Sequence, residues 1–238
     1  MKHVPPAPPA LGERDGLAYA LFEPEGEPSG GVVILHGAGS AKESHFDFAR
    51  TCRERGLAAL AFDARGHGRS SGELSPTATG DVLAMCDFMG EHAPHVALRG
   101  SSLGGFLAIQ AAALDPVAIA AVVAICPAPP EGLARGIASG DLTGFRVDRA
   151  ATVDWLKTLD LRVAAAALGP ATALMLLHAR GDERVPYTVS EGLHEAAADP
   201  KRLVVFPGGD HRSLQHDLEV QNLAARFIER AIAGRAGG

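Results

Sequence analysis

The sequence predicts an α/β fold, in which a mostly parallel twisted sheet is covered by helices on both faces. Short apolar runs alternate with longer helical patterns from residue 30 onward. The apolar runs are continuous rather than alternating with polar residues, which is typical of strands buried on both faces of a parallel sheet. The chain has 238 residues, of which 47% are hydrophobic, and this suits one domain with one core. We therefore expect a single domain over residues 1–238.

The individual elements follow from these patterns. The predicted strands are apolar runs rich in Val, Ile, Leu and Ala, and they are expected at residues 30–36, 57–63, 95–100, 118–126, 171–178 and 202–208. The predicted helices show helical spacing of apolar residues, and the first of them ends at a glycine. They are expected at residues 44–56, 77–91, 102–114, 189–198 and 214–233.

Two segments break this alternation. Residues 1–16 begin with MKHVPPAPPALG, whose four prolines favour an extended N-terminal arm. Residues 127–169 are long for one crossover, are rich in Gly, Pro and Ala, and contain VDWLKTL, a candidate amphipathic helix. Either a short insertion over the sheet, acting as a cap or lid, or an ordinary crossover with a long loop fits this second segment.

Charge and hydropathy exclude several classes of partner. The net charge of −6 offers no basic surface for nucleic acid. The longest apolar run, residues 117–126, is well short of the roughly 18 residues that span a membrane. The N-terminus carries a lysine without a following apolar stretch, unlike a secretory signal. We expect a cytoplasmic protein with no nucleic-acid or membrane partner, and either a monomer or a homodimer.

The three cysteines do not form a recognisable metal or disulfide pattern. Cys52, Cys86 and Cys126 are widely spaced and odd in number. Neither a disulfide framework nor a CxxC metal site fits that spacing. We expect buried free thiols and no metal.

Two serines lie side by side in LRGSSLGG (98–105), between a predicted strand and a predicted helix. A nucleophile elbow needs this context, with small residues two positions before and after the serine so that the backbone can turn tightly. Ser102 has Gly100 and Gly104 at these positions. The corresponding neighbours of Ser101 are Arg99 and Leu103, whose side chains are too large for such a turn. Ser102 is therefore the candidate nucleophile, and Ser101 is a neighbour.

A serine hydroxyl is a weak nucleophile at neutral pH, so it needs a base within hydrogen-bond reach and an acid that orients the base. Where a serine elbow occurs, the chain order is Ser, acid, His, each on a loop after a strand. Asp182 follows the strand predicted at 171–178, and His211 follows the strand predicted at 202–208. Asp210 competes for the acid role, but adjacent side chains in a loop usually point apart. We expect Asp182 to orient His211.

Four motifs together, HGAGS, GSSLGG, GDERVP and GGDH, resemble those of the α/β-hydrolase superfamily over most of the chain. Within it, the stretch from HGAGS to GRSSG is similar to small serine esterases, including cinnamoyl-ester and other acyl esterases, with dienelactone-hydrolase-like proteins as neighbours. The resemblance implies that Ser102 is the nucleophile, His211 the general base and then acid, and Asp182 its orienting partner. It also implies an oxyanion hole formed by the backbone N–H groups of Ala38 and Leu103.

The same resemblance implies supporting roles elsewhere. His36 is expected to support the oxyanion loop through hydrogen bonds, and the loop DARGHGRSSG (63–72) is expected to be architectural. Three apolar residues of the irregular segment are candidates for either the pocket lining or the core: Phe145, Trp155 and Leu156. Three further histidines are expected to be ordinary surface or core residues: His178, His194 and His216.

Two rival functions belong to other classes, and the first is nucleotide binding. GAGSAK lies between a predicted strand and a predicted helix, where nucleotide-binding loops occur. A dinucleotide motif, however, needs a third glycine where Lys42 stands, and the Gly-Lys-Ser/Thr of a phosphate loop is missing. A non-catalytic small-molecule-binding protein on a hydrolase scaffold is the second rival, since a fold does not guarantee an activity.

The sequence thus predicts a metal-independent serine hydrolase with no cofactor, and a carboxylesterase acting on small to medium acyl or aryl esters is the preferred activity. The expected partner is a small-molecule ester substrate. Thioester or peptide hydrolysis and acyl transfer pass through the same acyl-enzyme and stay open.

Overall fold

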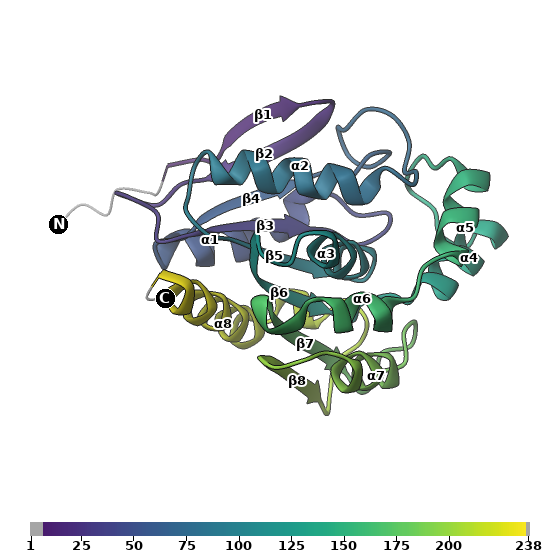
Figure 1. Cartoon of the computed structure of the whole chain (residues 1–238). Helices are drawn as coiled ribbons and strands as arrows, with labels where there is room; N and C mark the ends of the chain where they lie inside the picture. Colours follow the sequence, from purple (N-terminus) through teal and green to yellow (C-terminus); the bar gives the residue numbers. More distant parts are fainter. Residues whose placement is uncertain (1–6, 237–238) are drawn as a thin grey trace.

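The structure is a computed structural model that describes residues 7–236. Its centre is an eight-stranded sheet with the strand order β1-β2-β4-β3-β5-β6-β7-β8 (Figure 1). All neighbours from β4 to β8 pair in parallel, whereas β2 pairs antiparallel with both β1 and β4. The strands are β1 Ala10–Arg14, β2 Leu17–Phe22, β3 Gly31–Leu35, β4 Ala58–Phe62, β5 Val96–Ser101, β6 Ile119–Ile125, β7 Ala173–Ala179 and β8 Lys201–Phe206.

The central strands are buried along their whole length, which explains their continuous apolar sequences. Every residue of β3, β4, β5, β6 and β7 is buried. The edge strand β8 is only half-buried, because one of its sides lacks a neighbouring strand. The parallel sheet places the carboxyl ends of these strands along one edge, where α/β folds build their sites.

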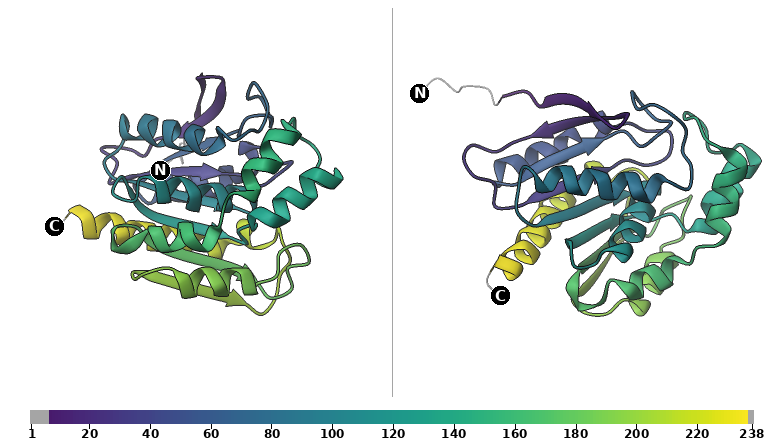
Figure 2. Two further views of the ribbon diagram at one scale, coloured as in Figure 1. Left: turned by 45° about the vertical axis from the view of Figure 1, so that its right-hand side comes forward. Right: turned by 45° about the horizontal axis from the view of Figure 1, so that its top comes forward.

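Helices cover both faces of the sheet (Figures 1 and 2). One face carries α1 Phe46–Glu54 and α8 Leu218–Ala236, and the other carries α2 Ala78–Gly90, α3 Leu103–Leu114, α6 Leu161–Ala167 and α7 Thr188–Ala196. Each face has its own apolar core, because alternate side chains of each strand point to opposite faces. Short 3₁₀ turns occur at η1 Lys42–His45, η2 Gly169–Ala171 and η3 Leu214–His216. The predicted α/β fold class, with helices on both faces, is confirmed.

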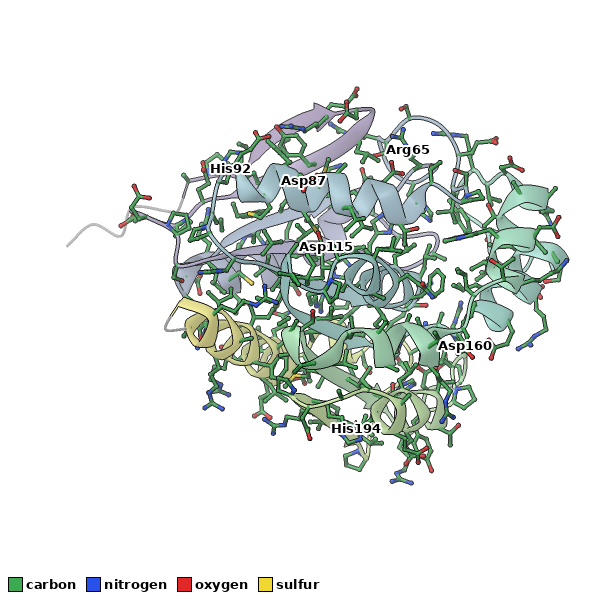
Figure 3. All side chains as sticks on the ribbon, in the orientation of Figure 1. Arg65, Asp87, His92, Asp115, Asp160 and His194 are labelled. Carbon is green, nitrogen blue, oxygen red and sulfur yellow. The ribbon has the colours of Figure 1, made fainter. Side chains whose placement is uncertain are left out.

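The irregular segment 127–169 contains an insertion and a crossover helix. Its helices α4 Pro130–Ser139 and α5 Arg149–Lys157 stand beyond the carboxyl ends of the strands (Figures 1 and 2). Asp160, labelled in Figure 3, caps the start of α6, because its side chain accepts hydrogen bonds from the N–H groups of Arg162 and Val163. Both interpretations of the segment thus apply to different parts of it. Its behaviour as a lid stays a prediction.

The loop after β4 anchors this segment to the body of the protein. The N–H of Arg146 donates to the carbonyl of Gly66 at 2.9 Å, and the N–H of Leu74 donates to the carbonyl of Arg146 at 3.0 Å. Residues 143–144 also pack against Gly39, next to the predicted oxyanion donor. The segment 127–169 therefore borders the HGAGS loop directly.

The sequence patterns did not predict the hairpin of β1 and β2. Residues 1–6 of the predicted arm lie outside the described residues, and Ala10–Arg14 forms an edge strand rather than a free arm. The turn between the two strands is Asp15-Gly16, with φ of 52° and 79°. Asp-Gly at such a turn is a recognised hairpin indicator, because both residues tolerate positive φ.

No helix within residues 7–236 is long and apolar enough to cross a membrane. The cysteines Cys52, Cys86 and Cys126 are free and buried. Burial raises the pKa of the Cys52 thiol to about 12, so this thiol stays protonated at neutral pH.

Candidate active site

Ser102 occupies a strained turn between β5 and α3. Its φ of 53° and ψ of −115° lie in a region that residues with side chains rarely adopt. Its N–H donates to the carbonyl of Ile125 at 2.9 Å, and its carbonyl accepts from the N–H of Ala128 at 3.2 Å. These bonds tie the turn to β6 and hold the serine at the carboxyl edge of the sheet.

The flanking glycines are needed because the backbone passes too close for any side chain. A Cβ at Gly100 would overlap the carbonyl of Gly104, and a Cβ at Gly104 would overlap the carbonyl of Leu35 on β3. The glycine frame that selects Ser102 in the sequence thus has a steric cause in the fold. This crossing of backbones is what presents the serine side chain outward.

The structure brings the three predicted catalytic side chains together in a line. Ser102 Oγ lies 3.0 Å from Nε2 of His211, and Nδ1 of His211 lies 2.8 Å from Oδ2 of Asp182. Asp182 follows β7 and His211 follows β8, so both side chains come from loops at the same sheet edge as Ser102. Since Asp182 is the acceptor at Nδ1, that nitrogen carries the proton, and Nε2 is free to accept the serine proton.

The Asp182 carboxylate is buried but well supplied with donors. Its Oδ1 accepts from the N–H groups of Arg184 and Val185 at 2.9 and 2.8 Å, and its side chain is fully buried. Burial alone would raise the pKa of this carboxyl, but the contacts with His178 and His211 and the two backbone donors outweigh it and hold the pKa far below its usual range. Asp182 is therefore ionised wherever the protein is folded at moderate pH.

Asp210 does not take the acid position. Its Oδ1 accepts from the N–H groups of Arg212 and Ser213, each at 2.9 Å, so the carboxylate caps its own exposed turn. Asp182, rather than its competitor, contacts the imidazole of His211.

His178 also contacts the acid, although the sequence placed it among ordinary histidines. It lies fully buried on β7, with Nε2 at 3.3 Å from Oδ2 of Asp182 and 2.9 Å from the carbonyl of Val185. Nδ1 lies 2.7 Å from the hydroxyl of Ser190. Because a carbonyl can only accept, Nε2 carries the proton and Nδ1 accepts from Ser190. The spacing of four residues from Asp182 was a signal for this contact, but it needed the strand end to be located.

The N–H groups of the two predicted oxyanion donors form no hydrogen bond within residues 7–236. Leu103 is the first residue of α3, so its N–H has no partner within the helix. The N–H of Ala38, in the HGAGS loop, donates to no described backbone carbonyl or side chain. A Cβ placed on the adjacent Gly37 would lie 3.4 Å from Cβ of Ser102, so this loop passes beside the serine.

His36 links the HGAGS loop to the loop after β4, as the resemblance implies. Its Nε2 accepts from the N–H of Ala64 at 3.0 Å, so its Nδ1 donates to the carbonyl of Gly37 at 2.8 Å. Burial lowers the pKa of this imidazole, which favours the neutral form that these two bonds require. His36 is a structural support of the loop and does not contact Ser102 Oγ.

Lys42 is committed to a buried ion pair. Its Nζ lies 2.6 Å from Oδ2 of Asp63, and its N–H donates to Oδ1 of the same carboxylate at 2.7 Å. The exposed fractions of the two side chains are 3% and 0%. GAGSAK therefore fixes the loop after β4 through Lys42 rather than offering this lysine to a phosphate.

A cavity of about 520 Å³ opens in front of Ser102 and His211. Its apolar lining includes Ala128, Pro129, Leu133, Leu142, Val185 and Pro186, and its polar lining includes Ser40, Ser44, Ser101, Gln215 and His216. Part of this lining comes from α4 and the loop after it, so the segment 127–169 shapes the pocket.

The three apolar candidates for the pocket lining lie elsewhere. Trp155 packs edge-on against Phe106 with ring centroids 5.8 Å apart, and Phe145 stacks on His67 at 4.3 Å. Leu156 is buried in the core of the α3 face. Of the two open interpretations, the core role holds for all three, because the pocket is lined by the earlier part of the segment.

A polar network supports the pocket wall beside the nucleophile. The hydroxyl of Ser101 donates to Oε1 of Gln215 at 2.6 Å. The fully buried Arg99 donates to the backbone carbonyl of Gln215 at 3.0 Å and to Nδ1 of His45 at 2.6 Å. Ser101 thus holds Gln215 in the wall and does not contact His211.

Cys126, Asp182 and His211 each place one potential metal-ligand atom within 4.8 Å of the others. Two of these groups already satisfy each other through the hydrogen bond between carboxylate and imidazole. Burial raises the pKa of the Cys126 thiol well above its ordinary value, which opposes the thiolate that a metal prefers. The donor set fits a hydrogen-bonded relay better than a metal site.

Known proteins resemble the chain in sequence over part of its length. A family model described as serine aminopeptidase, S33, matches residues 26–138. Human monoglyceride lipase is 34% identical over 128 residues, which cover 50% of this chain and 42% of the lipase. The uncharacterized protein YfhR of Escherichia coli K12 is 26% identical over 187 residues, covering 76% of this chain and 62% of YfhR. The matches therefore span less than two thirds of the length of these relatives.

Solved structures resemble the chain over nearly its whole length. Est1E from Butyrivibrio proteoclasticus, solved with ferulic acid bound, has a TM-score of 0.75 at 22% identity and covers 96% of this chain and 100% of its own. A soluble variant of monoglyceride lipase from Saccharomyces cerevisiae has a TM-score of 0.76 at 15% identity, covering 96% of both chains. The similarity to these structures concerns the fold.

Proposed function

We propose that this chain, which has the α/β-hydrolase fold, is a serine hydrolase and that its activity is the hydrolysis of small to medium acyl or aryl carboxylic esters. The observation that carries the proposal is the aligned contact of Ser102, His211 and Asp182 beside a cavity. Three such side chains from separate loops, in hydrogen-bond order, match what activation of a serine hydroxyl requires.

The proposed reaction begins with the transfer of the Ser102 hydroxyl proton to Nε2 of His211 as the oxygen attacks the ester carbonyl. The negative charge that develops on the carbonyl oxygen is stabilised by the N–H groups of Ala38 and Leu103. His211 then donates its proton to the departing alcohol, which leaves an acyl group on Ser102. A water molecule, deprotonated by His211, releases the acid and restores the serine. Asp182 stabilises the imidazolium in both halves.

The preference for esters rests on the pocket and on the relatives. The cavity of about 520 Å³ has room for a small or medium substrate, and its lining combines apolar and polar groups. Est1E was solved with an aromatic acid, and the sequence relatives include a monoglyceride lipase. Thioesterase, peptidase and acyltransferase activities use the same acyl-enzyme, so these are the alternatives within the class.

A direct test uses a fluorophosphonate probe together with p-nitrophenyl acetate and butyrate. The wild-type protein should be labelled and should cleave both esters, whereas Ser102→Ala should lose labelling and His211→Ala should lose nearly all turnover. Ser101→Ala is the matched control beside the nucleophile, and it should slow turnover far less. Hydrolysis that survives both Ser102→Ala and His211→Ala would sink the proposal.

The pH profile and the oxyanion loop give further checks. Turnover should fall at low pH, because a protonated imidazole cannot accept the proton of Ser102. Loss of one oxyanion donor typically reduces the rate by on the order of 10²- to 10³-fold. Ala38→Gly keeps the backbone N–H and should therefore change the rate little.

A non-catalytic binding protein on this scaffold is the candidate from another class. It would bind ligands in the cavity of the Ser102→Ala and wild-type proteins alike, and the wild type would leave the fluorophosphonate unreacted. Fractionation of the native host tests the proposed cytoplasmic location, and light scattering tests whether the protein is a monomer or a homodimer.

A further inference from the structure

Three arginines line the cavity in front of the proposed nucleophile. They are Arg135, Arg184 and Arg212, and the acidic residue among the lining residues is Asp141. The chain as a whole has 28 acidic and 22 basic residues, so its net charge is negative. The cavity mouth, defined here by the three arginines, is therefore more basic than the protein as a whole. The carboxylate of Asp141 is directed to its neighbour, since its Oδ2 accepts from the Ser139 hydroxyl at 2.6 Å.

These arginines come from three separate parts of the chain. Arg135 lies on α4, Arg184 lies in the loop after β7, and Arg212 follows His211 in the loop after β8. The parallel sheet and the inserted helix bring them to one opening. Because the three arginines are far apart in the sequence, they do not form a run of positive charge that sequence analysis could detect.

The guanidinium groups of Arg135 and Arg212 are not engaged elsewhere. Among residues 7–236, neither side chain forms an ion pair within 4.0 Å or donates a hydrogen bond, whereas Arg55 and Arg65 are held by Glu229 and Asp81. Uncommitted guanidinium groups at the rim of a pocket are suited to an anionic oxygen group on a ligand.

Arg184 is partly offset by an acid. Nε of Arg184 lies 3.5 Å from Oε1 of Glu183, while Oε2 of Glu183 accepts from the N–H of His211 at 3.2 Å. Glu183 is therefore an acidic side chain that contacts two residues of the cavity lining, although it does not line the cavity itself. Arg135 and Arg212 are expected to contribute more than Arg184.

We propose that the ester substrate carries an anionic group, of the carboxylate class, which the arginines at the cavity mouth recognise while Ser102 attacks the ester. This inference rests on the proposed serine hydrolase function and narrows its substrate class. The apolar lining would hold the hydrocarbon between the two functional groups of the substrate.

The size of the effect follows from the exposure of the arginines. All three are solvent-exposed, so each pair with a carboxylate is weak and is screened by salt. Two or three such pairs acting together should give about a tenfold preference for the anion in kcat/KM at low salt.

The test uses two matched pairs of esters, so that the anion can lie on either side of the scissile bond. The acyl pair is mono-4-nitrophenyl suberate and its methyl ester, and the alcohol pair is 4-acetoxybenzoate and its methyl ester. The ratio of kcat/KM, anion over neutral, is measured at about 20 mM and about 500 mM NaCl, where the Debye length is roughly 20 Å and roughly 4 Å. The expected ratio is about ten in at least one pair at low salt and approaches one at high salt.

Substitutions assign the effect to residues. Arg135→Gln and Arg212→Gln should each lower the ratio of the preferred pair several-fold, Arg184→Gln should lower it less, and the triple variant should bring it to about one. Arg230→Gln removes the same charge from an exposed position on α8 outside the cavity and should leave the ratio unchanged. Since each ratio compares two substrates of one variant, a loss of folded protein cancels.

Failure of this inference differs from failure of the proposed function. A wild type that cleaves the neutral esters through Ser102 but shows a ratio of one or less in both pairs at low salt overturns the anionic preference alone. An equal fall in the ratio with Arg230→Gln would also overturn it, because net charge rather than the cavity mouth would then be responsible. Hydrolysis of neutral esters that survives Ser102→Ala overturns the function beneath it.

Discussion

The carboxylate of Asp182 lies 3.3 Å from Nε2 of His178, an imidazole with no solvent exposure on β7. The same oxygen, Oδ2, lies 2.8 Å from Nδ1 of His211. One carboxylate oxygen of Asp182 therefore faces two imidazoles: that of His211, which is part of the proposed relay, and that of His178, which is not. His178 is a positioning residue, since it lies near the acid and contacts neither Ser102 nor the cavity.

Replacing His178 should impair turnover more than substrate binding. His178→Phe removes the N–H that faces Asp182, so the carboxylate should hold His211 less well and kcat should fall about tenfold with KM little changed. His178→Gln can retain a donor and should recover part of the loss. Steady-state kinetics over a range of pH provide the measurement, since a purely structural loss would lower active enzyme without altering the shape of the profile. His194→Gln on α7 is the matched control, and an unchanged kcat in His178→Phe would contradict the positioning role.

The stability of the protein should fall as the pH drops below about 6.5. Burial, aided by the neighbouring His36, lowers the pKa of His67 to about 4, and burial also lowers the pKa of His36 and His45. Between about pH 6.5 and pH 4 the unfolded chain binds protons at these positions and the folded chain does not, so acid favours unfolding. Each such histidine contributes up to about 1.4 kcal/mol per pH unit within its window.

Urea unfolding between about pH 7 and pH 5 measures this dependence. His67→Phe keeps a ring to stack on Phe145 but has no titrating group, so its dependence on pH should be flatter. His92→Gln, at a more exposed position, should keep the wild-type slope. The depressed pKa values of Asp63 and Asp182 act below the ordinary carboxyl range and do not produce this effect. A midpoint that stays constant over this range would refute the prediction.

The Lys42–Asp63 pair should be costly to break from one side. Asp63→Asn removes the buried partner of the Lys42 ammonium and leaves it only the half-exposed carboxylate of Glu43, at 3.0 Å. Loss of one partner of a buried pair typically destabilises by about 3–5 kcal/mol, and the remaining contact with Glu43 should keep the effect at or below the lower end of that range. The double variant Lys42→Met with Asp63→Asn should be less destabilised than Asp63→Asn alone, since no buried ammonium remains and the amide oxygen can still accept from the backbone N–H at position 42. Glu91→Gln, in an exposed pair with Arg14, is the control and should leave denaturant unfolding nearly unchanged. Equal unfolding midpoints for Asp63→Asn and wild type would show that the pair is unimportant.

Glycine 104 should tolerate no side chain, whereas a glycine of α2 should. Gly104→Ala places a Cβ against the carbonyl of Leu35, so β3 and α3 must separate and both stability and turnover should fall. Gly80 lies inside α2 with no atom within 4 Å of a built Cβ, so Gly80→Ala should stabilise by about 0.5–1 kcal/mol. Thermal unfolding and p-nitrophenyl butyrate turnover compare the two, and a neutral Gly104→Ala would show that the elbow can relax.

Several features of the fold could be predicted because they depend on residues that are close together in the sequence. The buried strands show as continuous apolar runs, and the elbow shows as glycines two positions either side of Ser102. Asp182 and His211 could be proposed because each directly follows such a run. Their roles in catalysis stay predictions, although the structure places their side chains in contact.

Other features depend on distant segments and could not be predicted. The contact of His178 with Asp182 requires the exact end of β7, where the chain turns back over the strand. Part of the pocket lining comes from α4 and not from the region of Trp155. This could not be predicted because it depends on how residues 127–169 fold over the sheet edge. The edge strand β1 could not be predicted because ALGER lacks the apolar run of a buried strand, whereas LAYALF in β2 is such a run and was missed.

Residue patterns along the chain suffice for the α/β class, the choice of Ser102 over Ser101, and the order of the candidate acid and base, because each depends on local backbone geometry or on side-chain patterns within one element. Which groups share the site depends on how distant segments pack together. Ser102 and His211 are 109 positions apart, and the arginines of the cavity mouth come from three different segments. Their proximity exists because parallel strands direct their carboxyl ends to one edge, where loops from distant parts of the chain converge.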